Sequence, residues 1–125
     1  ASALPRGTDR ETTARTDAMQ RALIAATDVP LGVARAATEV ATLLGAVARI
    51  GNPHVRSDAA LGALLADAAL RGALLNVRGN ATQIRDRERA AAYLEKADRL
   101  EAAGRAAARR AYHSATGVAN ERGSH

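Results

Sequence analysis

The sequence predicts an all-α protein, an antiparallel bundle of about four helices. Apolar residues recur every three or four positions over most of the 125-residue chain, and no segment shows the period-two alternation of a strand. Breaking and capping residues divide this pattern into four helix-length segments, at 8–27, 30–50, 58–77 and 86–113. Residues 1–113 are therefore expected to form a single helical domain, and residues 114–125 a flexible tail.

The first two segments are expected to be separate helices. Thr8 and Glu11 match a capping box, which marks the start of the first helix. Pro30 is expected to end that helix, because the residue before a proline avoids the helical conformation, and then to open the second helix. The second helix is apolar almost all round, which indicates packing on several sides.

A polar segment, residues 50–58, separates the second helix from an equally apolar third one. Gly51 suits the end of a helix, and an Asn after it is ordinary turn chemistry. Ser57 or Asp58 can cap the helix that follows. We therefore expect the chain to reverse direction within residues 50–58.

The last helix is expected to be more polar than the others. Asn80 or Asp86 can cap it. Its apolar positions form a narrow stripe close to a coiled-coil seam: Ile84, Ala91, Leu94, Ala97, Leu100, Gly104, Ala107 and Ala111. The other side chains of this helix are expected to be solvated.

The core must be built from small side chains. The chain is 47% hydrophobic, yet it has no Phe or Trp and one Met. At about 25 cal/mol per Å² of buried apolar surface, an alanine-rich core gains little per residue, so further burial is expected at a subunit interface. We therefore predict a homo-oligomer, in the simplest case a dimer. The absence of Cys excludes disulfides and a thiolate nucleophile, and with no apolar signal segment it favours a cytoplasmic location.

The charges exclude several classes of partner. The net charge of +5 comes from interleaved residues, and few aromatic residues are present to stack on bases, so no nucleic-acid partner is expected. Charged residues near the middle of both apolar helices argue against a membrane hairpin, because each is costly in lipid: Arg35, Glu39, Asp67 and Arg71. The three His lack ligand spacing, so no metal site is expected.

Several phrases, taken in order, resemble one family: Leu4-Pro5-Arg6-Gly7-Thr8, Thr27-Asp28-Val29-Pro30-Leu31, Gly51-Asn52-Pro53, Ser57-Asp58-Ala59, Gly62-Ala63-Leu64-Leu65 and Gly72-Ala73-Leu74-Leu75-Asn76-Val77-Arg78. Together they resemble the formiminotransferase-cyclodeaminase C-terminal family, which contains formimidoyltetrahydrofolate cyclodeaminase and bacterial methenyltetrahydrofolate cyclohydrolase. The resemblance covers residues 4–100. The chain departs from the family pattern at His54 and Gly79, and it has no counterpart of the family's N-terminal glycine-rich segment. It is accordingly expected to be a fragment, one piece of a cleaved chain or a shortened relative.

The resemblance implies a tetrahydrofolate derivative as substrate, and neither a metal nor a redox cofactor. In the cyclohydrolase reaction, water attacks a methenyl carbon and a ring opens. In the cyclodeaminase reaction, a folate nitrogen attacks a formimino carbon and ammonia leaves. Both need a group that accepts and returns a proton. Asp58 is the candidate for this catalytic carboxylate, held by backbone N–H groups at a helix start. From the residues alone, a simple N-cap pair is the favoured interpretation of Ser57 and Asp58.

Five further residues are candidates for binding the substrate: Asn52, Ser57, Asn76, Arg78 and Asn80. Each also has a structural explanation. Asn52 suits a turn, Asn76 a helix C-cap or a bond to the 50–58 backbone, and Asn80 a helix cap. Arg78 can pair with Asp58, meet the glutamate tail of folate or remain solvated. A basic cluster on the last helix, which includes Arg105, Arg109 and Arg110, is either a solvated face or a polyglutamyl site.

Two classes of function follow from the sequence. The first is a folate-interconverting enzyme of the cyclohydrolase or cyclodeaminase type. The alternative is a non-catalytic helical module, for oligomerisation or folate binding, which the missing glycine-rich segment and the thin core favour.

Overall fold

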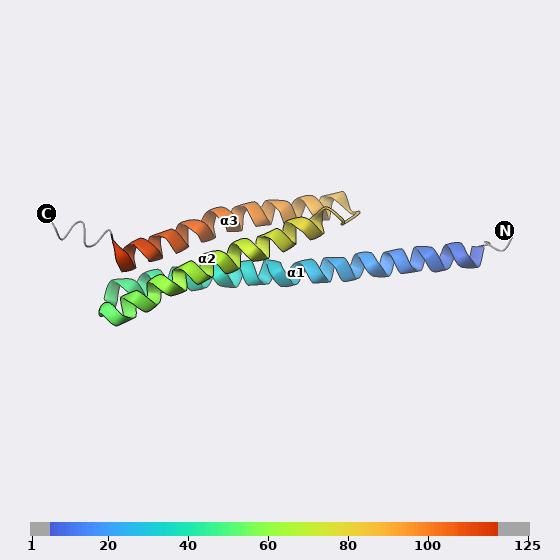
Figure 1. Cartoon of the computed structure of the whole chain (residues 1–125). Helices are drawn as coiled ribbons and strands as arrows, with labels where there is room; N and C mark the ends of the chain where they lie inside the picture. Colours follow the sequence, from blue (N-terminus) through green and yellow to red (C-terminus); the bar gives the residue numbers. More distant parts are fainter. Residues whose placement is uncertain (1–5, 118–125) are drawn as a thin grey trace.

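The computed structural model describes residues 6–117, and within this range the chain forms three helices and no strand. They are α1 (Arg6–Ile50), α2 (Pro53–Ala81) and α3 (Arg87–Thr116). Successive helices are antiparallel and all three pack on one another, while the N-terminal part of α1 extends beyond the other two (Figure 1). The all-α prediction is confirmed, but the number of helices is three, not four. Residues 118–125 of the expected tail lie outside the described range.

The helix boundary expected at Pro30 is absent, because Pro30 lies inside α1. A proline within a helix removes one backbone hydrogen bond and costs about 3 kcal/mol. Buried residues at helical spacing continue through this point, because Thr27, Leu31 and Ala34 are each at most 2% exposed. The Thr27 hydroxyl also donates to the Leu23 carbonyl at 2.7 Å. Packing of this continuous face against the other helices offsets the cost. The helix therefore continues through Pro30, although the residue before a proline disfavours the helical conformation.

The core is alanine-rich, as the composition predicts. Its main cluster comprises Leu31, Ala34, Ala37, Leu70, Ala73, Leu74, Val77, Ala81, Ile84, Ala90, Tyr93 and Ala97. The buried stripe of α3 has the predicted spacing, but its first turns lie one position away from the expected residues. Ala90 and Tyr93 are buried, whereas Ala91 and Leu94 are exposed. Burial of the large Tyr93 ring against α1 accounts for this choice between neighbouring positions.

All three helices meet around Gly104. A Cβ atom at this position would lie 2.5 Å from Leu70 Cδ2 on α2 and 2.6 Å from Thr38 Oγ1 on α1. No side chain fits in that space without moving its neighbours. The absence of a side chain at Gly104 therefore allows the close approach of the helices on which the bundle depends.

Tyr93 joins α3 to α1 through its hydroxyl group, which donates to Asp28 Oδ1 at 2.5 Å. Burial, followed by this hydrogen bond, raises the pKa of Tyr93 from 10.0 to about 12. As the pH rises, the unfolded chain therefore releases this proton before the folded chain does. The neutral ring stabilises the fold fully below pH 10, and this contribution is lost as the pH rises from 10 toward 12.

We expect Tyr93→Phe to remove this pH dependence. Urea unfolding of both proteins between pH 8 and the upper limit of this window should show a steeper alkaline loss of stability for the wild type than for the variant. Tyr112→Phe is the control, because Tyr112 is 38% exposed. Parallel pH profiles for wild type and Tyr93→Phe would contradict the assignment.

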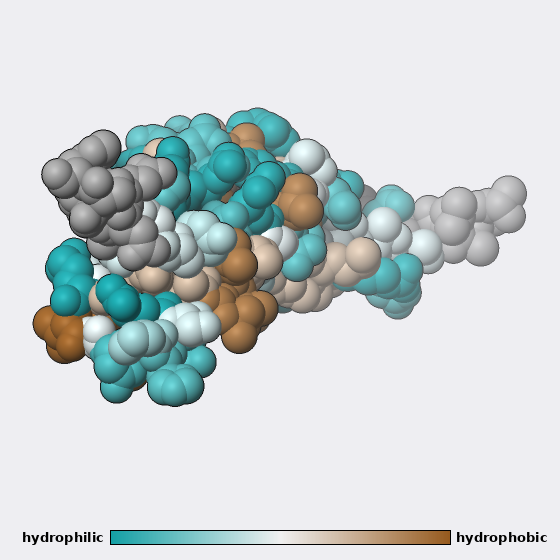
Figure 2. Space-filling model, turned by 60° about the vertical axis from the view of Figure 1, so that its left-hand side comes forward, coloured by the Kyte–Doolittle hydropathy of each residue, from teal (hydrophilic) through white to brown (hydrophobic). Residues whose placement is uncertain are grey.

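Large apolar side chains on α1 and α2 are exposed in this structure, among them Ile50 at 87%, Leu75 at 72% and Val29 at 68%. Brown apolar residues accordingly reach the surface between teal polar ones in Figure 2. By length and composition alone, Thr8–Ile50 and Pro53–Ala81 are both apolar enough to cross a membrane. The core thus uses only part of the apolar surface of these two helices.

Candidate functional site

The turn between α1 and α2 is tightly specified by two residues. A Cβ atom on Gly51 would lie 2.5 Å from Val55 Cγ1 and 3.2 Å from the Val47 carbonyl oxygen, so glycine is required for this close approach. Asn52 is extended, with φ −76° and ψ 177°, and its Oδ1 accepts a hydrogen bond from the Val55 N–H at 3.0 Å. The chain therefore reverses over Gly51 and Asn52 alone, and the direction in which the first turns of α2 face is fixed.

The helix start expected at Ser57 or Asp58 is wrong, because Asn52 is the N-cap of α2 and Pro53 is its first residue. Proline suits this position, since the N–H that it lacks would have no partner within the helix. Ser57 and Asp58 lie in the second turn, and both are exposed. Among the described residues, no hydrogen bond or ion pair involves the Asp58 carboxylate. The helix start therefore does not hold Asp58, which is presented outward from a rigid helix.

The capping role of Asn52 can be tested directly. Asn52→Ala is expected to lower the free energy of unfolding by about 1 kcal/mol, because the Val55 N–H loses its acceptor. Ser57→Ala is the matched control, and it should change stability by less than about 0.5 kcal/mol. Equal effects of the two substitutions in urea unfolding would contradict the cap assignment.

The other predicted binding residues lie at the far end of α2. Asn76 is 18 residues beyond Asp58, a separation of about 27 Å along the helix axis at about 1.5 Å per residue. Asn76 is exposed and is not the C-cap, a position that Thr82 occupies. The Asn80 carbonyl accepts from the Gln83 N–H at 3.0 Å, and Asp86, not Asn80, caps α3. Within one chain, these residues and Asp58 do not form a single site.

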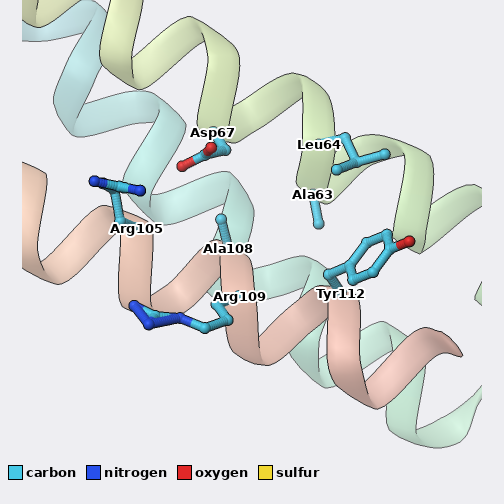
Figure 3. Close-up of a pocket in the computed structure, with 7 residues that line it drawn as sticks. All are labelled: Ala63, Leu64, Asp67, Arg105, Ala108, Arg109 and Tyr112. Carbon is cyan, nitrogen blue, oxygen red and sulfur yellow. The ribbon is translucent and has the colours of Figure 1, made fainter. Parts of the chain in front are cut away.

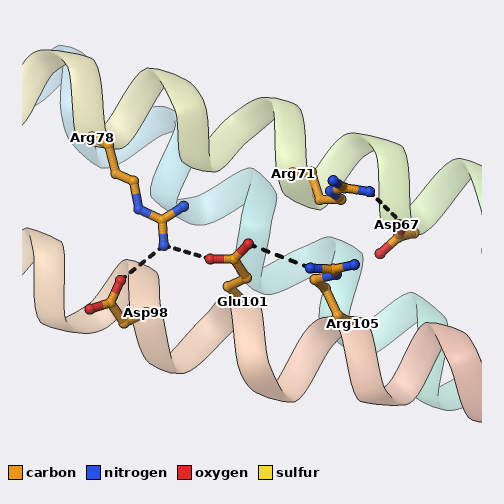
Figure 4. Close-up of polar contacts among 6 residues, drawn as sticks. All are labelled: Asp67, Arg71, Arg78, Asp98, Glu101 and Arg105. Carbon is orange, nitrogen blue, oxygen red and sulfur yellow. Dashed lines mark hydrogen bonds and ion pairs between the residues drawn. The ribbon is translucent and has the colours of Figure 1, made fainter.

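Arg78 faces α3 and does not pair with Asp58. Its guanidinium donates to Asp98 at 2.9 Å and to Glu101 at 2.7 Å (Figure 4). The hydrogen bonds to Asp98 and then Glu101 are the main causes that raise the pKa of Arg78 above its ordinary value. Glu101 also lies 3.9 Å from Arg105. The structure therefore gives Arg78 a role that was not among the three considered from the sequence, as a link between α2 and α3.

A shallow groove of about 330 Å³ lies between α2 and α3. Its lining residues are Ala63, Leu64, Asp67, Arg105, Ala108, Arg109 and Tyr112 (Figure 3). Two guanidinium groups, one carboxylate and a phenol therefore lie around apolar carbon in this groove. The basic cluster noted in the sequence supplies Arg105 and Arg109, but the contribution of α2 was not foreseen. Because nine residues separate Asp58 from Asp67, the two carboxylates project from opposite sides of α2.

No group of three or more His, Asp or Glu side chains is arranged to hold a metal ion within the part of the chain that the structure describes.

Comparison with known proteins relates this chain to a protein family. Residues 1–99 match the family described as Formiminotransferase-cyclodeaminase. The chain belongs to this family. It is also 42% identical over 117 residues to a methenyltetrahydrofolate cyclohydrolase from Methylorubrum extorquens, an alignment that covers 94% of this chain and 56% of the relative. The chain thus spans a little more than half the length of that relative.

The formiminotransferase-cyclodeaminase match includes Asp58 and all five predicted binding residues. Arg105, Arg109 and Tyr112 of the groove lie beyond its last residue. The turn and α2, more than the groove, are therefore the parts of the molecule where chemistry common to the family should be sought.

Proposed function

We propose that this protein acts in folate one-carbon metabolism as a methenyltetrahydrofolate cyclohydrolase, with Asp58 as the group that handles protons. The observation that carries this proposal is the 42% identity to a methenyltetrahydrofolate cyclohydrolase over 94% of the chain. A tetrahydrofolate derivative is the proposed substrate, and no metal or redox cofactor is required.

The proposed reaction needs one proton to be moved twice. Water attacks the cationic methenyl carbon, and the Asp58 carboxylate accepts a proton from that water as the new C–O bond forms. One of the two C–N bonds of the ring then breaks. The departing nitrogen takes that proton from Asp58, and the remaining hydroxyl group releases its own proton to solvent as it becomes the C=O of a formyl group on the other nitrogen. A carboxylate beside the electrophile also stabilises its positive charge.

The carboxylate of Asp58 has the freedom that this role demands. It is exposed and engaged in no described hydrogen bond, while the rigid first turns of α2 hold its backbone in place. A carboxylate committed to an internal ion pair, as those of Asp98 and Glu101 are with Arg78, would be less available as a base.

Two related functions compete with this proposal. Formimidoyltetrahydrofolate cyclodeaminase activity is supported by the family match alone. A non-catalytic folate-binding or oligomerisation module is supported by the large apolar side chains that α1 and α2 leave exposed.

One set of assays distinguishes these three functions. The loss of near-ultraviolet absorbance of methenyltetrahydrofolate should be faster with the protein than in buffer, and an equal rate would overturn the proposal. Ammonia release from formiminotetrahydrofolate would identify the cyclodeaminase instead. Calorimetric binding of either folate without turnover would identify the non-catalytic module.

A further inference from the structure

The groove between α2 and α3 carries charged side chains that the proposed reaction does not use. Asp67 lines it from α2, and Arg105 and Arg109 line it from α3 (Figure 3). Asp67 and Asp58 are nine residues apart, so their side chains leave α2 on opposite sides. The groove is therefore a second candidate site, and the hydrolysis proposed at Asp58 does not depend on it.

The charged groups of this groove are not used up by hydrogen bonds within the chain. The Asp67 carboxylate lies 3.8 Å from Arg71, and the Arg105 guanidinium lies 3.9 Å from Glu101. Both separations are longer than a hydrogen bond, which spans about 2.7–3.2 Å between N and O. The Arg109 side chain makes no hydrogen bond or ion pair with any described residue. The carboxylate and both guanidinium groups therefore retain hydrogen-bonding capacity for a ligand.

Further along the same two helices the charges are fully engaged. Arg78 of α2 donates to Asp98 at 2.9 Å and to Glu101 at 2.7 Å, both on α3 (Figure 4). Glu101 is thus held more closely by Arg78 than by Arg105. Direct hydrogen bonds between charged side chains therefore join α2 to α3 near Arg78, but not in the groove.

Asp67 and Arg105 have opposite charges and line the groove from facing helices, yet these two described residues form no ion pair with each other. A ligand that lies between them must direct a cation toward Asp67 and an anion toward the guanidinium groups. An α-amino acid meets this requirement, because its ammonium and carboxylate groups are attached to the same carbon atom. Guanidinium groups also match the geometry of a carboxylate, to which they donate two parallel hydrogen bonds.

Apolar surface lies beside these charges. Ala63 and Ala108 line the groove and are themselves buried, while Leu64 is 55% exposed and Tyr112 is 38% exposed. An aromatic side chain can pack against the ring of Tyr112, whereas a second charged group would find no partner at this end. The groove volume of about 330 Å³ is at the lower end of the range for small-molecule sites, which favours a small ligand.

We propose that this groove binds a free α-amino acid with an aromatic side chain. Arg105 and Arg109 bind its carboxylate, Asp67 accepts hydrogen bonds from its ammonium group, and its ring lies against Leu64 and Tyr112. A purely anionic ligand, such as a phosphate or a chain of glutamates, suits the groove less well, because it leaves Asp67 without a cation and is repelled by it. The amino acid satisfies all three kinds of surface in the groove at once.

Calorimetric titration of the whole chain with L-phenylalanine tests this proposal without reference to catalysis. Three related compounds each remove one feature: the N-acetyl derivative has no ammonium group, the amide has no carboxylate, and L-glutamate has no apolar side chain. We expect L-phenylalanine to bind and each of the others to bind at least about tenfold more weakly. Absence of binding by L-phenylalanine would overturn the proposal, as would equal or tighter binding of any of the three related compounds.

Substitutions locate the binding site on the chain. Arg109→Gln should weaken the binding of L-phenylalanine by about tenfold. Arg110→Gln is the matched control, because Arg110 is exposed on the same helix but does not line the groove, and it should leave the affinity unchanged. Asp67→Asn should weaken the binding of L-phenylalanine but not that of its N-acetyl derivative, which has no ammonium group to lose a partner. Equal losses for Arg109→Gln and Arg110→Gln would overturn the assignment of the groove, and so would an equal effect of Asp67→Asn on both ligands.

Discussion

Asp58→Asn is expected to lower the rate of methenyltetrahydrofolate hydrolysis by about 10²- to 10⁴-fold, the usual contribution of a positioned acid or base. The amide keeps the size of the carboxylate but cannot accept a proton from water. Since no described contact within the chain depends on Asp58, the fold should be unaffected. Circular dichroism and the urea midpoint should therefore match those of the wild type while the rate falls.

Asp67→Asn is the matched control for this experiment. Asp67 also lies on α2, where it faces Arg71 at 3.8 Å, but it projects from the opposite side of the helix. Loss of this ion pair, which is solvent-exposed, should cost less than about 1 kcal/mol of stability and leave the rate unchanged. If both substitutions reduced the rate equally, a general effect of charge would be indicated and Asp58 would lose its special role.

The prediction from sequence was most successful where periodicity alone decides the outcome. The spacing of apolar residues identified the all-α class, and the family resemblance was confirmed over residues 1–99. The helix boundary predicted at Pro30 was wrong because the prediction considered only the local backbone preference and not the packing of the residues on either side of Pro30. Thr27 and Leu31 are buried on one continuous face, and that tertiary contribution exceeds the local cost of proline.

The candidate site was predictable in part. The sequence identified the turn and its glycine, but it assigned the cap to Ser57 or Asp58 and not to Asn52. Both assignments satisfy capping chemistry, and it is the hydrogen bond from the Val55 N–H to Asn52 Oδ1 that identifies Asn52 as the cap. The pairing of Arg78 with Asp98 and Glu101 joins residues more than 19 positions apart, which no local pattern reveals.

Gly104 is where the largest loss of stability is expected. In an ordinary exposed helix, Gly→Ala stabilises by about 1 kcal/mol. At position 104 the added methyl would meet Leu70 and Thr38 at 2.5 and 2.6 Å. Leu70 is 1% exposed and cannot move aside into solvent. We expect Gly104→Ala to lower the free energy of unfolding by about 1–3 kcal/mol, and Gly104→Val to lower it further, as measured by urea unfolding.

Two further variants distinguish this steric effect from any general effect of substitution. Gly32→Ala is the control, because nothing lies within 4 Å of its Cβ position, and it should leave stability unchanged or raise it by up to about 1 kcal/mol. Thr38→Ala removes one of the two atoms in the way, so combining it with Gly104→Ala should cost less than the sum of the two single changes. Strict additivity, or equal stability of Gly104→Ala and Gly32→Ala, would mean that the helices are not held together by close approach at this glycine.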